Sequence, residues 1–537
     1  MDTEVLIVGA GPTGLTLAID LGRRGVRCTL LEQKDQPAFL PKMERVNARS
    51  MEIYRRMDLA EKIRTAGLRA DCPMDVYIVL SLREPPLLHL PYPSAAQARA
   101  QARATNDGTL PLEPYQLISQ YTLEPLLKSV AETIPSVIVR FGWEFLSLRQ
   151  DGEGVTARMR SSKGDEQEIR AAYLVGCDGG ASTVRKELGI GLSGEGNLLE
   201  LRQALFRCDE LFERLPIADG PGRGRHYHVA DDKATFLIMQ DSTKHWTLHS
   251  VLDSDEAMRT AFERTIGIPL KYEMLSCAPW RQNLLLADRY GHDRVFIAGD
   301  AAHLVIPTGG LGMNSGVGDA IDLSWKLAAT LVGWGGPNLL KSYEIERRQI
   351  GERNVGASRY ATIGRRKWRA MWRPNIREDS PAGAETRKNL SAVANIEQRK
   401  SNEMIGAELG YRYVGSPVIC DIPGGPEHLF RTYEPTTWPG ARLPHVWLDD
   451  GSAMQDRIPT SGYSILRLGN AKHDGSKLAG ALKSFGAPVT ELDIPDQVAR
   501  EIYGFDLILL RPDMHIVWRG NAAPDDATEV ARIATGH

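Results

Sequence analysis

Two widely separated glycine-rich segments constrain the fold of this chain most strongly. The first covers residues 9–14 (Gly-Ala-Gly-Pro-Thr-Gly). An apolar run over residues 4–8 precedes it, an apolar-rich stretch to about Arg24 follows, and a second apolar run from Cys28 ends at Glu32. This order predicts a strand, a tight turn, a helix and a second strand with an acid at its end. It is the pattern of a βαβ unit that binds a dinucleotide.

Each residue of this first turn has a physical role. Gly9 permits the turn, Gly11 lets a pyrophosphate approach the backbone, and Gly14 lets the helix pack closely on the strand. The helix N-terminus offers free N–H groups and a positive dipole end to phosphates, and Glu32 can accept hydrogen bonds from a ribose. The pattern leaves the choice between NAD and FAD open. The expected binding residues are Gly9, Gly11, Pro12, Thr13, Gly14, Glu32 and Gln33.

The second glycine-rich segment indicates that the cofactor is long. Residues 294–298 predict a buried strand, and residues 299–303 (Gly-Asp-Ala-Ala-His) follow it. Residues 307–314 (Pro-Thr-Gly-Gly-Leu-Gly-Met-Asn) then lead into a predicted helix from Met313 to Val332, whose N-terminus favours negative charge on a reduced ring. Only a two-ended cofactor such as FAD accounts for both segments. The residues expected to bind it here are Asp300, Pro307, Gly310, Leu311, Gly312, Met313 and Asn314.

Three further segments complete a recognisable pattern. They are residues 41–52, which begin Pro-Lys-Met-Glu, residues 119–124 (Ser-Gln-Tyr-Thr-Leu-Glu) and residues 177–185 (Cys-Asp-Gly-Gly-Ala-Ser-Thr-Val-Arg). Together with the two glycine-rich segments, and over essentially the whole chain, they resemble the single-component FAD-dependent aromatic hydroxylases. That group is typified by 4-hydroxybenzoate hydroxylase and phenol hydroxylase.

The resemblance assigns roles that the glycine pattern does not. It implies that Asp178 and Gly179 contribute to flavin and pyridine-nucleotide binding, that Gln120 lies near the flavin, and that Arg49 contacts the flavin phosphates. The family's usual Pro-Arg is Pro41-Lys42 here, and a lysine lacks the planar fork of arginine. A bidentate contact from this position is therefore not expected.

Glu44 lies near the position where relatives of the phenol hydroxylase type place a polar active-site group. Two interpretations stay open for it: a base that deprotonates a phenol, or a solvated carboxylate in a loop of mixed charge. A histidine of the predicted substrate sheet is the other candidate base. Pro307 is the second residue expected at the reacting centre, because its rigid ring shapes the loop beside the flavin.

The resemblance implies a reaction in two halves. NADPH or NADH reduces the flavin without a second dinucleotide domain, and O2 then gives a flavin C4a-hydroperoxide that hydroxylates a phenolic ring, ortho to its hydroxyl group. The cofactor supplies the oxygen chemistry, and the protein supplies position, electrostatics and exclusion of water. The alternatives are a Baeyer–Villiger or epoxidase-type tailoring oxygenase for a polycyclic or polyketide substrate and, more remotely, a flavin-binding scaffold or sensor.

The expected fold is α/β, with a Rossmann-like FAD-binding domain, an inserted β-sheet substrate domain and a C-terminal thioredoxin-like domain. The FAD-binding domain is assigned to residues 1–75, 112–190 and 285–350, and the substrate sheet and a flap to residues 76–111 and 191–284. Residues 351–410 are expected to form a helical connector and residues 411–537 the thioredoxin-like domain, without a CxxC pair. The proline-rich excursion is either an active-site flap or a surface insertion.

The substrate sheet is expected from three strand-like runs, near residues 226–229, 234–239 and 245–251. In a strand His226 and His228 lie on one face and Tyr227 on the other. Since a phenolic substrate needs apolar walls and a few polar anchors, these three residues are candidates to line its site.

Composition excludes several other classes of protein. The net charge of -3 argues against nucleic-acid partners, and the nearest thing to a basic run, residues 365–369 (Arg-Arg-Lys-Trp-Arg), is expected to be a solvated helix face or a contact to another part of the protein. The 6 cysteines are scattered without metal-ligand or redox spacing, as in a cytoplasmic protein with reduced thiols and no metal site. No signal peptide and no bilayer-length apolar run are evident, so no membrane association is expected. The expected partners are a small phenolic substrate and O2, with a homodimer as the family-based expectation.

Overall fold

The computed structural model describes residues 1–39, 42–215, 217, 223–469 and 474–537. Its first sheet carries the order β16-β17-β10-β1-β2-β7, with β8 and β9 continuing from β10. The strands are β1 (Thr3–Val8), β2 (Cys28–Glu32), β7 (Val137–Phe141), β8 (Trp143–Gln150), β9 (Val155–Ser161), β10 (Glu166–Gly176), β16 (Gly291–His292) and β17 (Val295–Ile297).

Three neighbouring strands of this sheet end at the same edge. β1 runs parallel to β10, and β10 runs parallel to β17. The three turns that follow these strands, beginning at Gly9, Cys177 and Gly299, therefore lie side by side although they are far apart in sequence. The apolar residues of β1 are buried, as expected of a parallel strand covered on both faces.

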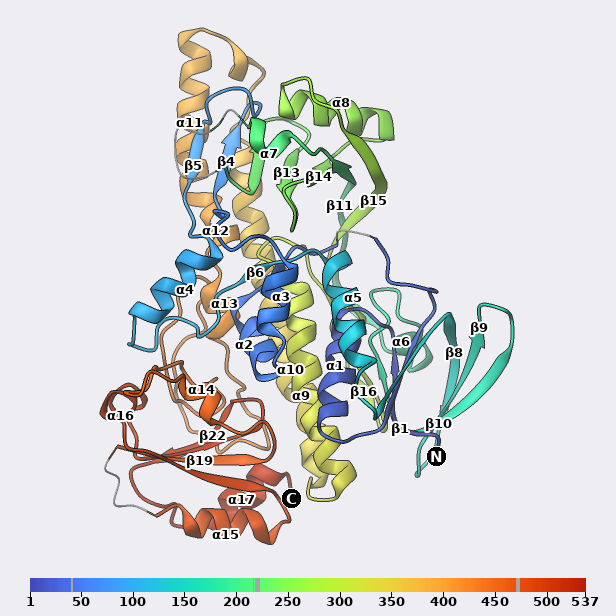
Figure 1. Cartoon of the computed structure of the whole chain (residues 1–537), viewed down its shortest axis with the longest axis vertical. Helices are drawn as coiled ribbons and strands as arrows, with labels where there is room; N and C mark the ends of the chain where they lie inside the picture. Colours follow the sequence, from blue (N-terminus) through green and yellow to red (C-terminus); the bar gives the residue numbers. More distant parts are fainter. Residues whose placement is uncertain (40–41, 216, 218–222, 470–473) are drawn as a thin grey trace.

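Helices α1 (Pro12–Arg23) and α9 (Gly312–Val332) pack against each other beside this sheet (Figure 1). Each follows one of the two glycine-rich segments, so both predicted helices are confirmed. The smaller elements of this region are β3 (Arg45–Val46), β6 (Gln116–Leu117), α2 (Ala48–Arg56), α3 (Ala60–Ala66), α5 (Gln120–Ala131) and α6 (Thr183–Glu187).

The second sheet has the order β18-β15-β11-β14-β13-β12-β4-β5. Its strands are β4 (Val76–Val79), β5 (Leu88–Leu90), β11 (Leu192–Arg207), β12 (His226–Val229), β13 (Phe236–Met239), β14 (His245–Ser250), β15 (Glu273–Ala287) and β18 (His303–Leu304). Short helices α7 (Leu211–Arg214) and α8 (Asp255–Ile266) accompany it. One face, including Tyr227 and Trp246, packs with Phe262 of α8 in an apolar core.

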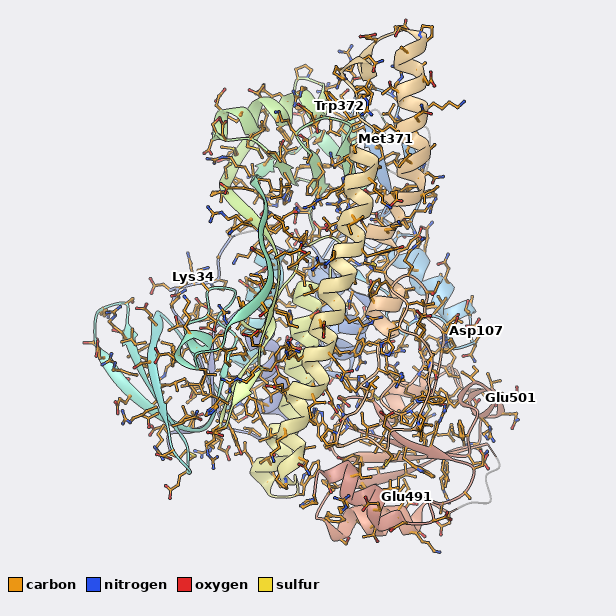
Figure 2. All side chains as sticks on the ribbon, turned by 180° about the vertical axis from the view of Figure 1, so that it is seen from behind. Lys34, Asp107, Met371, Trp372, Glu491 and Glu501 are labelled. Atoms are coloured by element: carbon orange, nitrogen blue, oxygen red, sulfur yellow. The ribbon has the colours of Figure 1, made fainter. Side chains whose placement is uncertain are left out.

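Helix α10 (Pro337–Arg369) connects the parts of the molecule. Its 33 residues give a length of about 50 Å, and Figure 2 shows it from behind, with Met371 and Trp372 just beyond its end. The helix continues through residue 350, where the sequence suggested a domain boundary. Helices α11 (Pro381–Glu397), α12 (Arg399–Asn402) and α13 (Ile405–Leu409) follow, consistent with the expected helical connector.

The C-terminal module has the strand order β20-β19-β21-β22. β19 runs parallel to β20 and antiparallel to β21, which pairs with β22 in the predicted hairpin. This is the expected thioredoxin-like arrangement. Its elements are β19 (Tyr463–Leu468), β20 (Val489–Ile494), β21 (Leu507–Leu510), β22 (Ile516–Gly520), α14 (Met454–Arg457), α15 (Ser476–Ser484), α16 (Gln497–Tyr503) and α17 (Ala527–Thr535).

The proline-rich excursion contributes to two regions. β4 and β5 join the second sheet, whereas α4 (Ala95–Ala104) packs against the C-terminal module. Arg103 of α4 lies 4.0 Å from the ring centroid of Trp447, whose indole N–H donates to the Ala102 carbonyl at 2.8 Å. α4 is therefore a contact between domains, which corrects the idea of an active-site flap for this part. Among the helices of the described residues, none combines the length and apolar composition needed to cross a bilayer.

Candidate functional site

The first glycine turn is closed by contacts that only glycine permits. Gly9 has a φ of +105°, and a Cβ there would lie 2.4 Å from the Cys177 carbonyl oxygen. A Cβ on Gly14 would lie 2.0 Å from the Gly9 carbonyl oxygen. The turn therefore packs directly on the neighbouring turn after β10. Gly11, the N-cap of α1, has only a Glu124 carboxylate oxygen near its Cβ position, at 4.0 Å, and so leaves room for a ligand.

Thr13 joins the two glycine-rich segments. A Cβ on Gly299 would lie 2.6 Å from the Thr13 hydroxyl oxygen, and one on Gly316 would lie 2.2 Å from it. Pro12 is buried at the start of α1. These close approaches bring the two glycine-rich segments into contact, so that one ligand can reach both.

Glu32 lies at the first turn, where a ribose is expected. Its Oε2 accepts from the Ala10 N–H at 3.0 Å and its Oε1 from the Lys34 N–H at 3.1 Å. The next residue, Gln33, is exposed. Gln120, at the start of α5, donates from its amide to Glu124 Oε1 at 2.5 Å. Its place beside Gly11, through Glu124, agrees with a position near the cofactor.

The Asp178 carboxylate has mainly a structural task. Its Oδ1 accepts from the Ser182 hydroxyl at 2.5 Å, and its Oδ2 accepts from the N–H groups of Thr183 and Val184 at 2.7 and 3.1 Å. These bonds satisfy the N-terminus of α6. The neighbouring Gly179 has a φ of +79°, which favours glycine.

The segment of residues 299–303 carries the exposed Asp300 and is held from behind by buried polar side chains. Asp300 is exposed to solvent. The protein atoms near its carboxylate nevertheless desolvate it and raise its pKa. Behind it, Asp319 accepts from His303 at 2.8 Å and from the Gly299 N–H at 3.0 Å, and pairs with Arg347 at 2.7 Å. Asp319 and Arg347 escaped the sequence analysis because they lie inside long helices without a motif.

Asn314 ties the loop expected beside the flavin to the segment that carries Glu44. Its amide donates to the carbonyls of Gly310 and Arg45 at 2.6 and 3.1 Å, and its Oδ1 accepts from the Asn47 N–H at 2.9 Å. Pro307 is exposed and accepts from the Gly310 N–H at 2.9 Å.

The rest of this loop is held by packing against α10. Leu311 is buried with Ala357 of α10, whereas Gly312 and Met313 stay partly accessible at the start of α9. The loop is thus held on one side and open on the other.

Glu44 forms an ion pair, which decides its chemical character. Its Oε1 lies 2.5 Å from Arg225 Nη2 and 3.2 Å from His226 Nε2. Although desolvation by burial raises the pKa of Glu44, the attraction of Arg225 and His226 outweighs it, so the pKa lies well below its usual range. Such a carboxylate is a weak proton acceptor but a strong partner for an imidazole N–H.

His226 and His228 lie on the face of the second sheet that points away from the apolar core. Desolvation lowers the pKa of His226 to about 4 and that of His228 well below its usual value. In both rings Nδ1 is buried and has no hydrogen-bond partner within the described residues. Both imidazoles are therefore neutral at ordinary pH, with one nitrogen each unused.

The position of Tyr227 corrects the expectation that this residue lines the substrate site. It lies on the opposite face of β12, fully buried in the apolar core, and its hydroxyl donates to the Arg223 carbonyl. Strand alternation predicted this separation of faces. The sequence could not say which face points toward the substrate.

Three residues missed by the sequence analysis complete the histidine face. The ring of Phe236 stacks on His249 with centroids 4.4 Å apart, and lies 5.6 Å from His228. The guanidinium carbon of Arg365, from α10, lies 5.2 Å from the same Phe236 centroid. We call the group of His226, His228, Phe236, His249 and Arg365 the histidine face.

Arg49 does not point to a flavin site. It is 6% exposed, its guanidinium donates to the Asp513 carbonyl at 2.8 Å, and it lies 3.9 Å from Glu52. This corrects the expectation of a phosphate contact, because α2 turns this side chain toward the C-terminal module. Pro41, from the same segment, lies outside the described residues.

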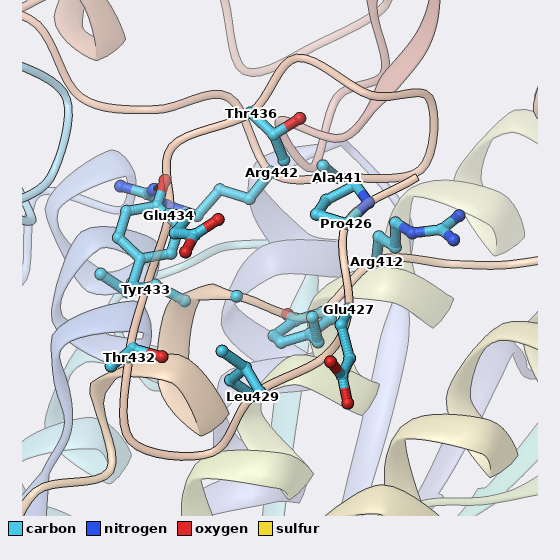
Figure 3. Close-up of a pocket in the computed structure, with 13 residues that line it drawn as sticks. Arg412, Pro426, Glu427, Leu429, Thr432, Tyr433, Glu434, Thr436, Ala441 and Arg442 are labelled. Atoms are coloured by element: carbon cyan, nitrogen blue, oxygen red, sulfur yellow. Dashed lines mark hydrogen bonds between the residues drawn. The ribbon is translucent and has the colours of Figure 1, made fainter. Parts of the chain in front are cut away.

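A separate pocket lies between the connector and the C-terminal module (Figure 3). Arg412, Glu427, Tyr433 and Arg442 are among its lining residues. Arg442 donates to the Tyr433 hydroxyl at 3.2 Å. None of the residues expected to bind flavin or substrate lines this pocket, so it is distinct from the site described above.

Comparisons with known proteins agree with this geometry. Residues 2–358 match the model of an FAD binding domain, and residues 436–536 match the C-terminal domain of aromatic-ring hydroxylases. The chain is 32% identical to the FAD-dependent monooxygenase apdD of Emericella nidulans, over 99% of this chain and 90% of that protein. It is 32% identical to aklavinone 12-hydroxylase RdmE of Streptomyces purpurascens, over 98% and 97%.

A solved structure resembles the whole chain as well. The rebeccamycin biosynthetic enzyme RebC with reduced flavin superimposes with a TM-score of 0.90 and 29% identity, over 99% of both chains. The convergence of the glycine turns, the room at Gly11 and the exposed Asp300 fit the same cofactor in this chain. The chain therefore belongs to the single-component FAD-dependent aromatic-ring hydroxylases, and FAD is its cofactor.

Proposed function

We propose that this monooxygenase uses NADPH or NADH and O2 to hydroxylate a phenolic ring, ortho to the existing hydroxyl, and that His226 accepts the phenolic proton. The carrying observation is the contact of His226 Nε2 with the Glu44 carboxylate, which leaves Nδ1 of the same ring without a partner within the described residues. Bound FAD would supply the oxygen-transfer chemistry.

The hydrogen-bond pattern assigns the tautomer of His226. Because the pKa of Glu44 is low, its carboxylate only accepts, and the hydrogen of the neutral imidazole must be on Nε2. Nδ1 then carries the lone pair and has no partner within the described residues. The geometry orients an acceptor nitrogen, with Glu44 as a positioning residue, while desolvation holds the pKa of His226 at about 4 and makes it a weaker base than a free imidazole.

Arg225 supports the same step by its charge. It is 5% exposed and pairs with Glu44 at 2.5 Å, so the dyad sits beside a fixed cation. A phenolate oxygen formed at this place would be stabilised by that charge in a desolvated site. Asn314 connects the Glu44 segment to the loop of Gly310, which supports a position of the dyad near the expected flavin ring.

The test compares His226→Gln with an exposed control, His292→Gln, in FAD-loaded protein. We expect the first variant to lower kcat for hydroxylation of neutral phenols by about 10²- to 10⁴-fold, the usual contribution of a general base. A nitrophenol, which is ionised without help at neutral pH, should recover most of the lost rate. NAD(P)H consumption, peroxide and hydroxylated product are measured together. Equal losses for both substrates, or no loss, would remove His226 from this role.

A polycyclic phenol is the second candidate substrate, because RdmE, a relative at 32% identity, is named as an aklavinone hydroxylase. Polycyclic phenols therefore belong in the same panel. The structure of the product separates ring hydroxylation from the lactone of a Baeyer–Villiger reaction and from an epoxide, since all three add one oxygen atom.

A further inference from the structure

Arg365 is a cation without a counter-ion in the part of the chain that the structure describes. It makes no ion pair or hydrogen bond there, and its Nε is buried without a partner. Its guanidinium carbon lies 5.2 Å from the centroid of the Phe236 ring, and the carboxylate of Glu44, which is paired with Arg225, also attracts it. A partly buried guanidinium whose Nε has no acceptor among the described residues is costly unless a ligand supplies one.

The other charges around it do not compensate. Glu44 is already paired with Arg225, and Asp231 lies 3.8 Å from Arg369. Asp231 also lies 4.0 Å from Arg264, so it has two cations of its own. With the three histidines neutral, no carboxylate among these groups is left to pair with Arg365, and the histidine face carries a net positive charge before substrate binds.

A second donor beside it is fixed by a chain of buried contacts. The Trp368 indole can only donate, and it donates to Gln398 Oε1 at 2.9 Å. The amide nitrogen of Gln398 therefore faces His228 Nε2, at 3.2 Å, and that nitrogen must accept. The neutral ring consequently carries its hydrogen on Nδ1, which has no partner within the described residues.

We propose that Arg365 and the Nδ1–H of His228 form a subsite for a carboxylate group on the aromatic substrate, with Gln398 and Trp368 as positioning residues. The inference rests on the proposed function and narrows its substrate class to aromatic acids. Both donors border Phe236, so a carboxylate there would belong to a ring lying against the histidine face. His226 has the opposite polarity at Nδ1 and is free to take a phenolic proton.

The experiment measures binding to oxidised, FAD-loaded protein without NAD(P)H, by the change in flavin absorbance. The probes are a hydroxynaphthoic acid and the matching naphthol, which differ only in the carboxylate. We expect the acid to bind more tightly, and Arg365→Gln to weaken its binding by about tenfold to a hundredfold, as for a lost charge-assisted hydrogen bond. Binding of the naphthol should change by less than about threefold.

Matched variants separate this role from a general loss of structure. Arg366→Gln removes an exposed cation one residue away on α10 and should leave both affinities unchanged. Arg365→Lys keeps the charge and should recover part of the preference for the acid. An equal loss for acid and naphthol in Arg365→Gln would overturn the subsite.

Gln398→Glu tests the positioning chain directly. A carboxylate there accepts from both Trp368 and His228, which moves the hydrogen of His228 to Nε2. Nitrogen NMR of labelled histidine should report Nδ1–H in the native protein and Nε2–H in the variant, together with weaker binding of the acid. A native His228 that is protonated on Nε2 would refute the proposal.

The two proposals fail in different ways. If acid and naphthol bind equally to the native protein, the subsite is wrong while hydroxylation stands. If the acid is preferred and the preference depends on Arg365, but no phenol is hydroxylated, the subsite stands and the proposed function is wrong.

Discussion

Two clusters of buried charge lie toward the two ends of α10, and they differ in how completely their members are paired. Near its first turns, Glu346 meets Lys326, Arg511 and Asp322 at the junction with the C-terminal module. Near its last turns, Arg365 meets an aromatic ring and neutral histidines. In the first cluster every charged side chain pairs with another member, whereas in the second some hydrogen-bond donors and acceptors have no partner within the described residues.

The junction cluster illustrates a buried network that serves structure. Arg511 lies 2.6 Å from Glu346, 2.9 Å from Asp322 and 2.5 Å from Asp513, and Lys326 lies 2.7 and 2.6 Å from Asp322 and Glu346. Burial raises the pKa of Asp322, so a proton is retained among three acids and two cations. Because every charge has partners inside the protein, no ligand is needed to explain the cluster.

The comparison suggests a criterion for interpreting buried charges. Charges that are paired inside the protein stabilise domain contacts, and charges without a partner mark candidate ligand sites. The largest expected effect comes from breaking the paired cluster. Arg511→Met should lower the free energy of unfolding by about 3–5 kcal/mol, since three acids then share one lysine. Thermal unfolding of FAD-loaded protein measures it.

The control for this variant is Arg467→Met, which breaks a surface pair with Asp493 in the same module. That change should cost about 0–1 kcal/mol. If both variants lost equal stability, the junction network would have no special weight.

Acid should lower the free energy of unfolding through both regions, because each contains buried histidines that are neutral in the folded protein. Desolvation by burial lowers the pKa of His226 to about 4 and those of His249 and His515 to about 3. Unfolded histidines titrate near pH 6.5, so the unfolded chain binds more protons between about pH 6.5 and pH 3. Stability is therefore fully present above pH 6.5 and is lost as the pH falls through this window.

One variant isolates a single proton of this effect. His515→Asn should reduce the slope of the free energy of unfolding against pH by up to about 1.4 kcal/mol per pH unit between pH 6.5 and pH 4. His292→Asn, at an exposed position, should leave the slope unchanged. Denaturant unfolding at several pH values measures both, and an unaltered slope in the first variant would show that His515 is charged in the folded protein.

A weaker paired contact joins α4 to the C-terminal module. Arg103→Ala removes the guanidinium that lies over Trp447 and donates to the Gly451 carbonyl at 2.9 Å. The expected cost is about 0.5–1 kcal/mol, because the contact is exposed. Thermal unfolding checks this, with Arg99→Ala on the same helix as the control; a cost above that of Arg511→Met would reverse the ranking of the two contacts.

The sequence predicted the flavin end of the molecule well because its constraints are local. A glycine at which a Cβ would lie 2.4 Å from a carbonyl oxygen, such as Gly9, is visible as a motif, and the strand and helix around it follow from periodicity. Three such turns on parallel strands have only one way to converge. The FAD-binding fold was therefore predictable from the chain alone.

The substrate end was less predictable because its contacts join distant elements. Arg365 meets Phe236 only through the packing of α10 on the second sheet, and Arg49 turns to Asp513 because α2 borders the C-terminal module. No local pattern encodes such meetings. The sequence predicted that His226 and Tyr227 lie on opposite faces of the strand. Which face is buried depends on the packing of α8 against the side that carries Tyr227.

The smallest effect on stability is expected where the charge is unpaired. Arg365→Gln removes a cation that has no counter-ion among the described residues, so folding loses no ion pair and is relieved of a desolvated charge. The free energy of unfolding in the absence of substrate should stay within about 0.5 kcal/mol of the native value or rise slightly. Thermal unfolding beside Arg511→Met measures this contrast. A loss above about 2 kcal/mol would mean that Arg365 is paired in solution, and the criterion that separates the two clusters would fail at the residue on which it depends most.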